Sequence, residues 1–214
     1  MFDIAPEYWQ AIGQGVLMTL WLTLASWLIA LAIGTLLGVM RSAPLGFIRS
    51  IASGYTEFFR NIPLLTVLFF MYYGVPNTGL RIDAVNSAII GIGVYTGAYV
   101  GEVVRAGLET VSKGNIEAAR SLGLSFIQSM WHVQLPQAVR AAIPPMGTLL
   151  IALLKNTSLA GTVTVQELFF QSRFVQDRTF NPDILLLSGA IYLAMTLPLG
   201  ALVSVIERRW AILR

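Results

Sequence analysis

The chain has 214 residues, of which 56% are hydrophobic and 12% are charged. Soluble domains carry roughly 25% charged residues, so this composition excludes an ordinary water-soluble domain. The absence of cysteine excludes disulfides and thiolate metal sites, and the one histidine, His132, argues against a histidine-based cluster, so we predict no metal site. The net charge of +3 could suggest an anionic partner, but the positions of the cations matter more than their sum.

Five apolar stretches are long enough to cross a bilayer, which takes about 20 helical residues. They lie at about 16–40, 55–73, 85–104, 141–165 and 184–206, and the fourth is interrupted by KNTS in its second half. No tandem repeat, low-complexity tract or Gly/Ser linker separates them. The sequence therefore predicts one all-α integral membrane domain over residues 1–214. The opening MFDIAPEYWQ is acidic where a signal peptide would be basic, so we expect no cleaved leader.

Lys and Arg residues divide unevenly between the two sets of segments outside the spans. One set holds nine of them: Arg41, Arg49, Arg105, Lys113, Arg120, Arg140, Arg208, Arg209 and Arg214. The other set, which includes the N-terminus, holds only Arg81, Arg173 and Arg178. Because cytoplasmic loops are enriched in Lys and Arg, we predict that the N-terminus lies outside and the C-terminus inside.

The most polar stretch, EAARSLGLSFIQSMWHVQLPQA, would then face the cytoplasm. It predicts two short helices joined at Gly123, with Ser125 and Gln128 forming a capping box at the start of the second. Pro136 is expected to end or bend the second helix. Large apolar side chains crowd that helix at Phe126, Ile127, Met130 and Trp131. Exposed apolar bulk on a short helix outside the bilayer favours a docking element.

Two other interpretations of this stretch are possible. A DNA-reading helix needs basic residues for phosphates, and Leu124 to Pro136 contains no Lys or Arg, so we expect no nucleic-acid partner. An amphipathic linker lying on the membrane surface, in contact with membrane lipid, fits the spacing and composition and stays open.

The order Glu117-Ala118-Ala119, Gly123 and Val133-x-Leu135-Pro136 resembles the EAA loop of the membrane subunits of bacterial ABC importers. YTEFFRNIPLL, GEVVRAGLETVSKGN and LLKNTSLAGTVTVQEL are similar to the histidine/glutamine/glutamate permeases of the polar amino-acid branch. The family prefers isoleucine at Val133 and often has Gln at Asn115 and Asp at Asn156. The departure at Asn156, a neutral residue where the family often has an acidic one, bears on the charge of the substrate. The resemblance covers about residues 12–209.

This resemblance implies a type I ABC importer transmembrane domain in a bacterial cytoplasmic (inner) membrane. Its implied partners are a dimeric cytoplasmic ATPase that carries ATP and Mg²⁺, an extracytoplasmic solute-binding protein, and a second permease copy or a sister permease. No cofactor is expected on this chain. The loop at 117–136 would be the coupling helix, with ATPase contacts by Glu117, Ala118, Ala119, Gly123, Phe126, Ile127, Met130, Trp131, Leu135 and Pro136.

Charges within the spans need partners or a wet cavity, because each costs about 2.5–3.5 kcal/mol at mid-bilayer. Glu57 and Arg60 are three residues apart, as are Glu102 and Arg105, so each pair can meet on one helix face. We predict that both are structural ion pairs.

Lys155 follows fourteen mostly apolar residues from Ala141, a rise of about 21 Å that places it beyond the midplane. The adjoining Asn156, Thr157 and Ser158 could line a substrate pathway, or could form interhelical hydrogen bonds only. The resemblance favours the pathway, in which Lys155 would pair with an α-carboxylate. Backbone carbonyls around Asn61, Pro63 and Leu64 would form another wall.

No phosphate-binding loop, nucleophile elbow or metalloprotease motif is present, so ATP hydrolysis is expected on a separate chain and this chain is not expected to be an enzyme. The sequence therefore predicts the permease subunit of an ABC importer for a polar amino acid. An ion-gradient-driven secondary carrier is the main alternative. It would predict inverted repeats and unpaired buried carboxylates, neither of which we find.

Overall fold

The computed structural model describes residues 5–210, with the side chains of residues 209 and 210 not described. Arg214 and part of the opening segment therefore lie outside the described residues. Within them the chain is helical and contains no strand. Four helices are long and apolar enough to cross a membrane, and a bent pair can supply a fifth crossing. An all-helical membrane protein was the prediction, and it is confirmed.

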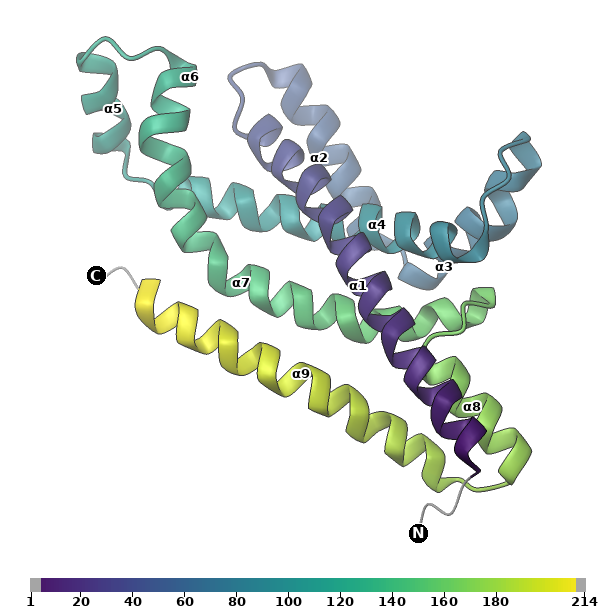
Figure 1. The fold of residues 1–214 in the computed structure, drawn as a ribbon. Helices are drawn as coiled ribbons and strands as arrows, with labels where there is room; N and C mark the ends of the chain where they lie inside the picture. Colours follow the sequence, from purple (N-terminus) through teal and green to yellow (C-terminus); the bar gives the residue numbers. More distant parts are fainter. Residues whose placement is uncertain (1–4, 211–214) are drawn as a thin grey trace.

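The longest helix, α1 (Pro6–Arg41), crosses the molecule diagonally and packs along α4 (Ala84–Glu109) (Figure 1). α1 begins ten residues before the predicted first span. Asp83 caps α4 by accepting a hydrogen bond from the Asn86 N–H at 2.9 Å. These two helices form the centre of the bundle.

Small residues allow α1 and α4 to approach closely. A Cβ atom added at Gly34 would lie 2.3 Å from Val100 Cγ1, and one at Gly38 would lie 2.4 Å from Val104 Cγ1. On α4, a Cβ atom added at Gly93 would lie 2.7 Å from Ile29 Cγ2 of α1. Small residues spaced four apart bring membrane helices into close backbone contact, which strengthens van der Waals packing.

The predicted second span is not one rod. α2 (Gly46–Asn61) stops at an extended Ile62 and Pro63, and α3 (Leu64–Phe69) leaves at 103° to it. A π-helical turn (η1, Phe70–Gly74) and a 3₁₀ turn (η2, Val75–Thr78) continue α3. The predicted span at 55–73 therefore contains a break. Pro63 accounts for it, because proline has no N–H for the helix ladder and disfavours helical geometry in the preceding residue.

After α4 come α5 (Lys113–Ser121) and α6 (Phe126–Ser129), then a π-helical segment (η3, Met130–Gln134), α7 (Leu135–Asn156) and a 3₁₀ segment (η4, Thr157–Val163). Pro136, which was predicted to end or bend the second helix, does not end the helical run. It lies at the start of α7, where the preceding π-helical turn accommodates its missing N–H, and the helical run continues to Val163.

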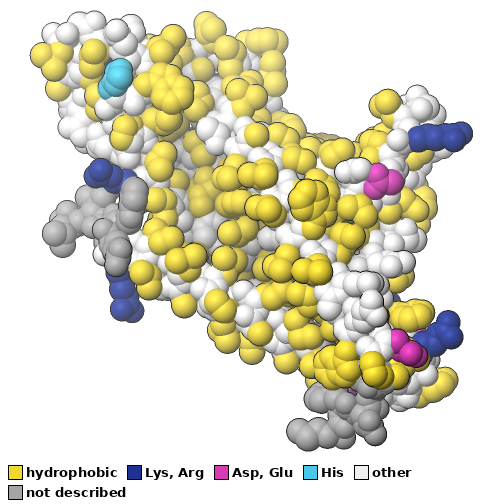
Figure 2. Space-filling model, viewed as in Figure 1, with side chains coloured by type: hydrophobic (Ala, Val, Ile, Leu, Met, Phe, Trp, Pro, Cys, Tyr) yellow, Lys and Arg dark blue, Asp and Glu magenta, His cyan; other side chains and the backbone are white. Residues whose placement is uncertain are grey.

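The segment between the fourth and fifth predicted spans contains a twelve-residue helix, α8 (Leu168–Thr179). α8 packs against α1 and α9 (Asp183–Trp210). α9 lies beside α7 (Figure 1). Figure 2 shows apolar side chains over the broad middle of the molecule and charged ones towards its margins. That distribution suits a bundle whose sides face lipid.

Candidate functional site

The α5–α6 hairpin (residues 113–134) is formed by local capping and one special turn. Gly123 has a φ of +80°, a left-handed conformation that costs other residues about 1–2 kcal/mol. Ser125 Oγ accepts from the Gln128 N–H, and Gln128 Oε1 accepts from the Ser125 N–H at 2.9 Å. The capping box predicted from the sequence is confirmed, and with Gly123 it fixes the direction in which α6 leaves the turn.

One face of this hairpin presents apolar side chains to solvent. Leu122 is 83% exposed, Ile127 66% and Trp131 63%, and Phe126 is also exposed. Met130, which was predicted to join them, is 5% exposed and packs against Leu108 and Ala138. Met130 therefore belongs to the interior, where it packs between α4 and α7.

The remaining predicted coupling residues divide between surface and interior. Glu117 and Ala118 are exposed, whereas Ala119 is buried. Leu135 is half-buried against the same small core as Met130, and Pro136 is exposed. The Glu117 residue is thus exposed, while Leu135 packs against the small core that joins the hairpin to α4 and α7.

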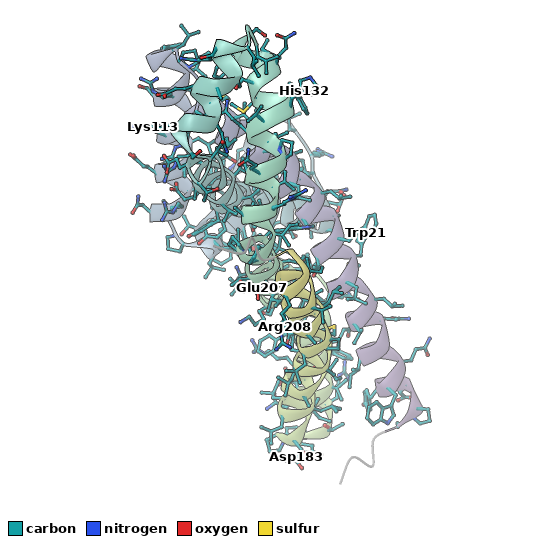
Figure 3. All side chains as sticks on the ribbon, turned by 90° about the vertical axis from the view of Figure 1, so that its left-hand side faces the viewer. Trp21, Lys113, His132, Asp183, Glu207 and Arg208 are labelled. Atoms are coloured by element: carbon teal, nitrogen blue, oxygen red, sulfur yellow. The ribbon has the colours of Figure 1, made fainter. Side chains whose placement is uncertain are left out.

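The hairpin lies at one end of the molecule. In Figure 3, Lys113 and His132 lie at the top, Asp183 lies at the bottom, and Glu207 and Arg208 near the end of α9 lie between them. The hairpin therefore projects past the end of α9, away from the end of the bundle where α8 joins α9 (Figures 1 and 3). An apolar surface in that position is accessible to another macromolecule.

Charged side chains near the C-terminal end of α4 form a cluster around Glu102. Its carboxylate contacts the guanidinium groups of Arg41 and Arg105, and Arg60 lies 3.4 Å away. Glu102 and Arg105 thus pair as the sequence predicted. The predicted Glu57–Arg60 pair does not form among the described residues, because α2 packs on α4 and brings Arg60 to Glu102 instead.

Of the predicted pathway segment, Lys155 is exposed, Asn156 and Ser158 are half-buried, and Thr157 is fully buried. The hydroxyl groups of Thr157 and Ser158 donate to the carbonyls of Leu154 and Lys155. Thr157 therefore faces the interior of the bundle and cannot contact a passing solute in this conformation. Lys155 and Asn156 remain accessible.

A cavity of about 180 Å³ lies between α4 and α7 and is lined in part by Asn156. Its other lining residues are Tyr95, Thr96, Tyr99, Leu149, Ala152 and Leu153. The hydroxyls of Tyr95 and Tyr99 are 3.1 Å apart, and the Arg60 guanidinium lies 5.9 Å from the centre of the Tyr99 ring. The cavity wall thus includes the hydroxyl-bearing Tyr95 and Tyr99 and the amide-bearing Asn156, with the Arg60 guanidinium close to Tyr99.

The residues predicted to form a pathway wall on the second span lie at the α2–α3 break. The Pro63 carbonyl accepts from the Thr66 and Val67 N–H groups, and the Leu64 side chain is buried in the core. Asn61 is exposed, and its amide donates to the Glu57 carbonyl at 2.7 Å. The α2–α3 break exposes Asn61, but Pro63 and Leu64 are used by the fold itself.

A buried carboxylate, Glu167, joins several elements at the end opposite the hairpin. It caps α8 by accepting from the Phe169 and Phe170 N–H groups, and it also accepts from the Tyr192 hydroxyl. The next N–H, that of Leu168, donates to Thr19 Oγ1 on α1 at 3.1 Å. Burial raises the pKa of Glu167, opposed by these hydrogen bonds.

Sequence reasoning missed four of these residues as site candidates: Leu122, Tyr95, Tyr99 and Glu167. The four-residue spacing of Tyr95 and Tyr99 does indicate a shared helix face. Glu167 is followed by three apolar residues, and glutamate is not among the residues preferred at an N-cap, so its role carries little signal in the sequence. Leu122 carries no signal beyond its place beside Gly123.

An apolar helical bundle with a capped hairpin projecting from one end has the architecture of a multi-pass membrane protein. The chain matches the family of binding-protein-dependent transport system inner membrane components over residues 30–212 and belongs to that family. It is therefore the permease subunit of an ABC importer, in which a separate ATPase subunit hydrolyses ATP and a substrate-binding protein is the other partner.

Two curated relatives and one solved structure document the similarity. The chain is 39% identical over 192 residues to the probable glutamine ABC transporter permease protein GlnM of Bacillus subtilis, covering 87% of this chain and 89% of that protein. It is 36% identical over 210 residues to the glutamate transport system permease protein GluC of Corynebacterium efficiens, covering 90% and 92%.

The solved structure is that of an amino acid ABC transporter with histidines. One of its chains superimposes with a TM-score of 0.88 at 32% identity, covering 95% of both chains. The type I importer fold that the sequence resemblance implied is thereby supported over nearly the whole chain, and the secondary-carrier alternative is set aside.

Proposed function

We propose that this permease passes a polar amino acid from an external binding protein to the cytoplasm, powered through the α5–α6 hairpin. The amino-acid class is supported by relatives named for glutamine and glutamate transport. We further propose the orientation predicted from Lys and Arg placement, with the N-terminus and α8 outside and the hairpin inside.

The observation that carries this proposal is the exposed apolar face of the hairpin. Leu122, Ile127 and Trp131 are more than half exposed, and the hairpin that carries them projects beyond the end of α9 (Figure 3). Buried aromatic and aliphatic anchors dominate the binding energy of protein interfaces. We therefore assign these side chains, with Phe126, to a cleft on the cytoplasmic ATPase, whose ATP and Mg²⁺ are held outside this chain.

The solute pathway is proposed to run beside α7 and η4. Lys155 offers an ammonium to an α-carboxylate, and the cavity at Asn156, Tyr95 and Tyr99 offers polar partners for the rest of the solute. Polar groups are tolerated at membrane depth where they line a cavity. The neighbouring Arg60 lies close enough to Tyr99 to belong to the same polar region.

Two ATPase subunits would require two hairpins, so we propose a permease dimer in the membrane. A homodimer and a heterodimer with a sister permease both satisfy this requirement. Coexpression with the permease, ATPase and binding-protein genes of its own locus, followed by purification, distinguishes them by the number of different permease chains recovered.

The proposal is tested by reconstituting the permease and ATPase in proteoliposomes and adding the binding protein with radiolabelled L-glutamine or L-glutamate. We expect uptake that requires both ATP and the ATPase subunit. Uptake driven by an ion gradient in vesicles without the ATPase would overturn the proposal. ATP-driven uptake of a different class of solute would overturn the amino-acid assignment alone.

A further inference from the structure

A second cavity lies between η4 and α8, at the end of the molecule opposite the hairpin. It measures about 390 Å³, within the roughly 300–1,000 Å³ typical of small-molecule sites. Its lining residues are Ser158, Leu159, Gly161, Thr162, Phe169, Phe170, Arg173, Phe174 and Asp177. Ser158 also belongs to the pathway segment, so this cavity adjoins the proposed pathway.

The charges in this cavity come from one face of α8. Arg173 and Asp177 are one helical turn apart and both line the cavity, yet no ion pair involves either of them among residues 5–210. A cation placed N-terminal to an anion at this spacing is the weaker order for a helical pair. A guanidinium and a carboxylate are thus both available on the wall of one pocket.

The same two charges complement an α-amino acid. A guanidinium binds a carboxylate through two parallel hydrogen bonds, and a carboxylate accepts from an ammonium group. Phe169, Phe170 and Phe174 supply apolar walls for the aliphatic part of such a solute. Arg178, the next cation on α8, does not line the cavity, and its guanidinium lies 5.2 Å from the centre of the Phe174 ring.

We infer that this cavity is an outer binding site for the zwitterionic amino acid, occupied after its release by the binding protein and before it reaches Asn156. Arg173 would hold the α-carboxylate and Asp177 the α-ammonium. The inference rests on the proposed function, because it takes α8 as extracytoplasmic and the solute as an amino acid.

Cysteine protection tests the site, since the chain contains no cysteine of its own. Thr162→Cys and Phe169→Cys each place a thiol on the cavity wall, and Phe180→Cys places one on a side chain that is 90% exposed and outside the cavity. The permease–ATPase complex, without binding protein, is labelled by a membrane-impermeant thiol reagent. We expect L-glutamine or L-glutamate to slow labelling at positions 162 and 169 but not at 180.

The charge assignments are tested in the same background. Arg173→Gln and Asp177→Asn should each raise the concentration for half-protection by about tenfold or more, since each loses a hydrogen bond to a charged group. Arg178→Gln is the matched control and should leave protection unchanged. N-acetyl-L-glutamine, which has no ammonium, should not protect.

The outcomes separate this inference from the proposed function. ATP-driven uptake with no protection at either cysteine would overturn the outer site and leave the function standing. Protection seen only when binding protein is added would also overturn it, because α8 would then be a docking surface for that protein. Absence of ATP-driven amino-acid uptake by the unsubstituted complex would overturn the function itself.

Discussion

The hydroxyl of Tyr192 on α9 donates a 2.8 Å hydrogen bond to the fully buried carboxylate of Glu167 at the start of α8. Glu167 is also packed closely against η4, because a Cβ atom at Gly161 would lie 3.0 Å from Glu167 Oε1. This carboxylate therefore joins η4, which continues from the proposed pathway, to the two helices that form the end of the bundle opposite the hairpin.

We expect Glu167→Ala to lower the stability of the purified permease by about 2–4 kcal/mol. An N-cap contributes roughly 0.5–2 kcal/mol, and a buried hydroxyl left unpaired costs roughly 1–3 kcal/mol. Thermal unfolding in detergent measures the change. Tyr192→Phe removes one hydrogen bond without leaving a buried donor, so its effect should be smaller. An unfolding temperature equal to that of the unsubstituted protein in Glu167→Ala would contradict this role.

Gly34→Ala should destabilise the bundle, because its Cβ would lie 2.3 Å from Val100 Cγ1 and 2.8 Å from the Gly97 carbonyl oxygen. Overpacking of this kind typically costs about 1–3 kcal/mol. Gly54→Ala is the matched control, since Gly54 is also helical and has nothing within 4 Å of an added Cβ. There, alanine should gain up to about 1 kcal/mol in helix propensity. Equal unfolding temperatures for the two variants would refute close packing at Gly34.

Gly123→Leu should uncouple ATP hydrolysis from uptake in the reconstituted complex without unfolding the spans. The φ of +80° disfavours leucine by about 1–2 kcal/mol, so the turn would relax and redirect α6. Gly123→Asn should retain most coupling, because asparagine tolerates this conformation. The ratio of solute transported to ATP hydrolysed is the measurement, and a normal ratio in Gly123→Leu would remove the hairpin from the coupling mechanism.

Trp131→Ala should weaken ATPase binding and Met130→Ala should lower stability, although the two residues are adjacent. Trp131 is exposed, so its removal should weaken ATPase binding by about 2 kcal/mol or more and leave unfolding unchanged. Met130 is buried, so its removal should cost about 2–5 kcal/mol of stability. Binding is measured on purified subunits in detergent. Unchanged ATPase affinity in Trp131→Ala would exclude this face as the interface.

Lys155→Met should reduce uptake to background while the permease still assembles with the ATPase. The substitution keeps the approximate length and apolar stem of the side chain but removes the proposed partner of the α-carboxylate. Lys155→Arg should retain part of the uptake, because it keeps the charge. Size-exclusion chromatography verifies assembly. Normal uptake in Lys155→Met would exclude this side chain from the pathway.

Local features of the chain were predictable from sequence. Four of the apolar stretches lie largely within long apolar helices of the structure, and the Ser125–Gln128 capping box formed as expected. Both depend on residues within a few positions of one another, where helix geometry alone determines which groups meet. The family resemblance was also carried by contiguous motifs.

Tertiary packing decided the partners that lie far apart in sequence. Arg60 pairs with Glu102, 42 residues away, instead of Glu57 on its own helix, because α2 lies against α4. Glu167 meets Tyr192, 25 residues on, through the docking of α9 on α8. Met130 is buried against Leu108 and Ala138, whereas the adjacent Trp131 is exposed, because the packing of the helices covers only one of them. Helical periodicity assigns residues to faces, but only the packing of the helices determines what each face contacts.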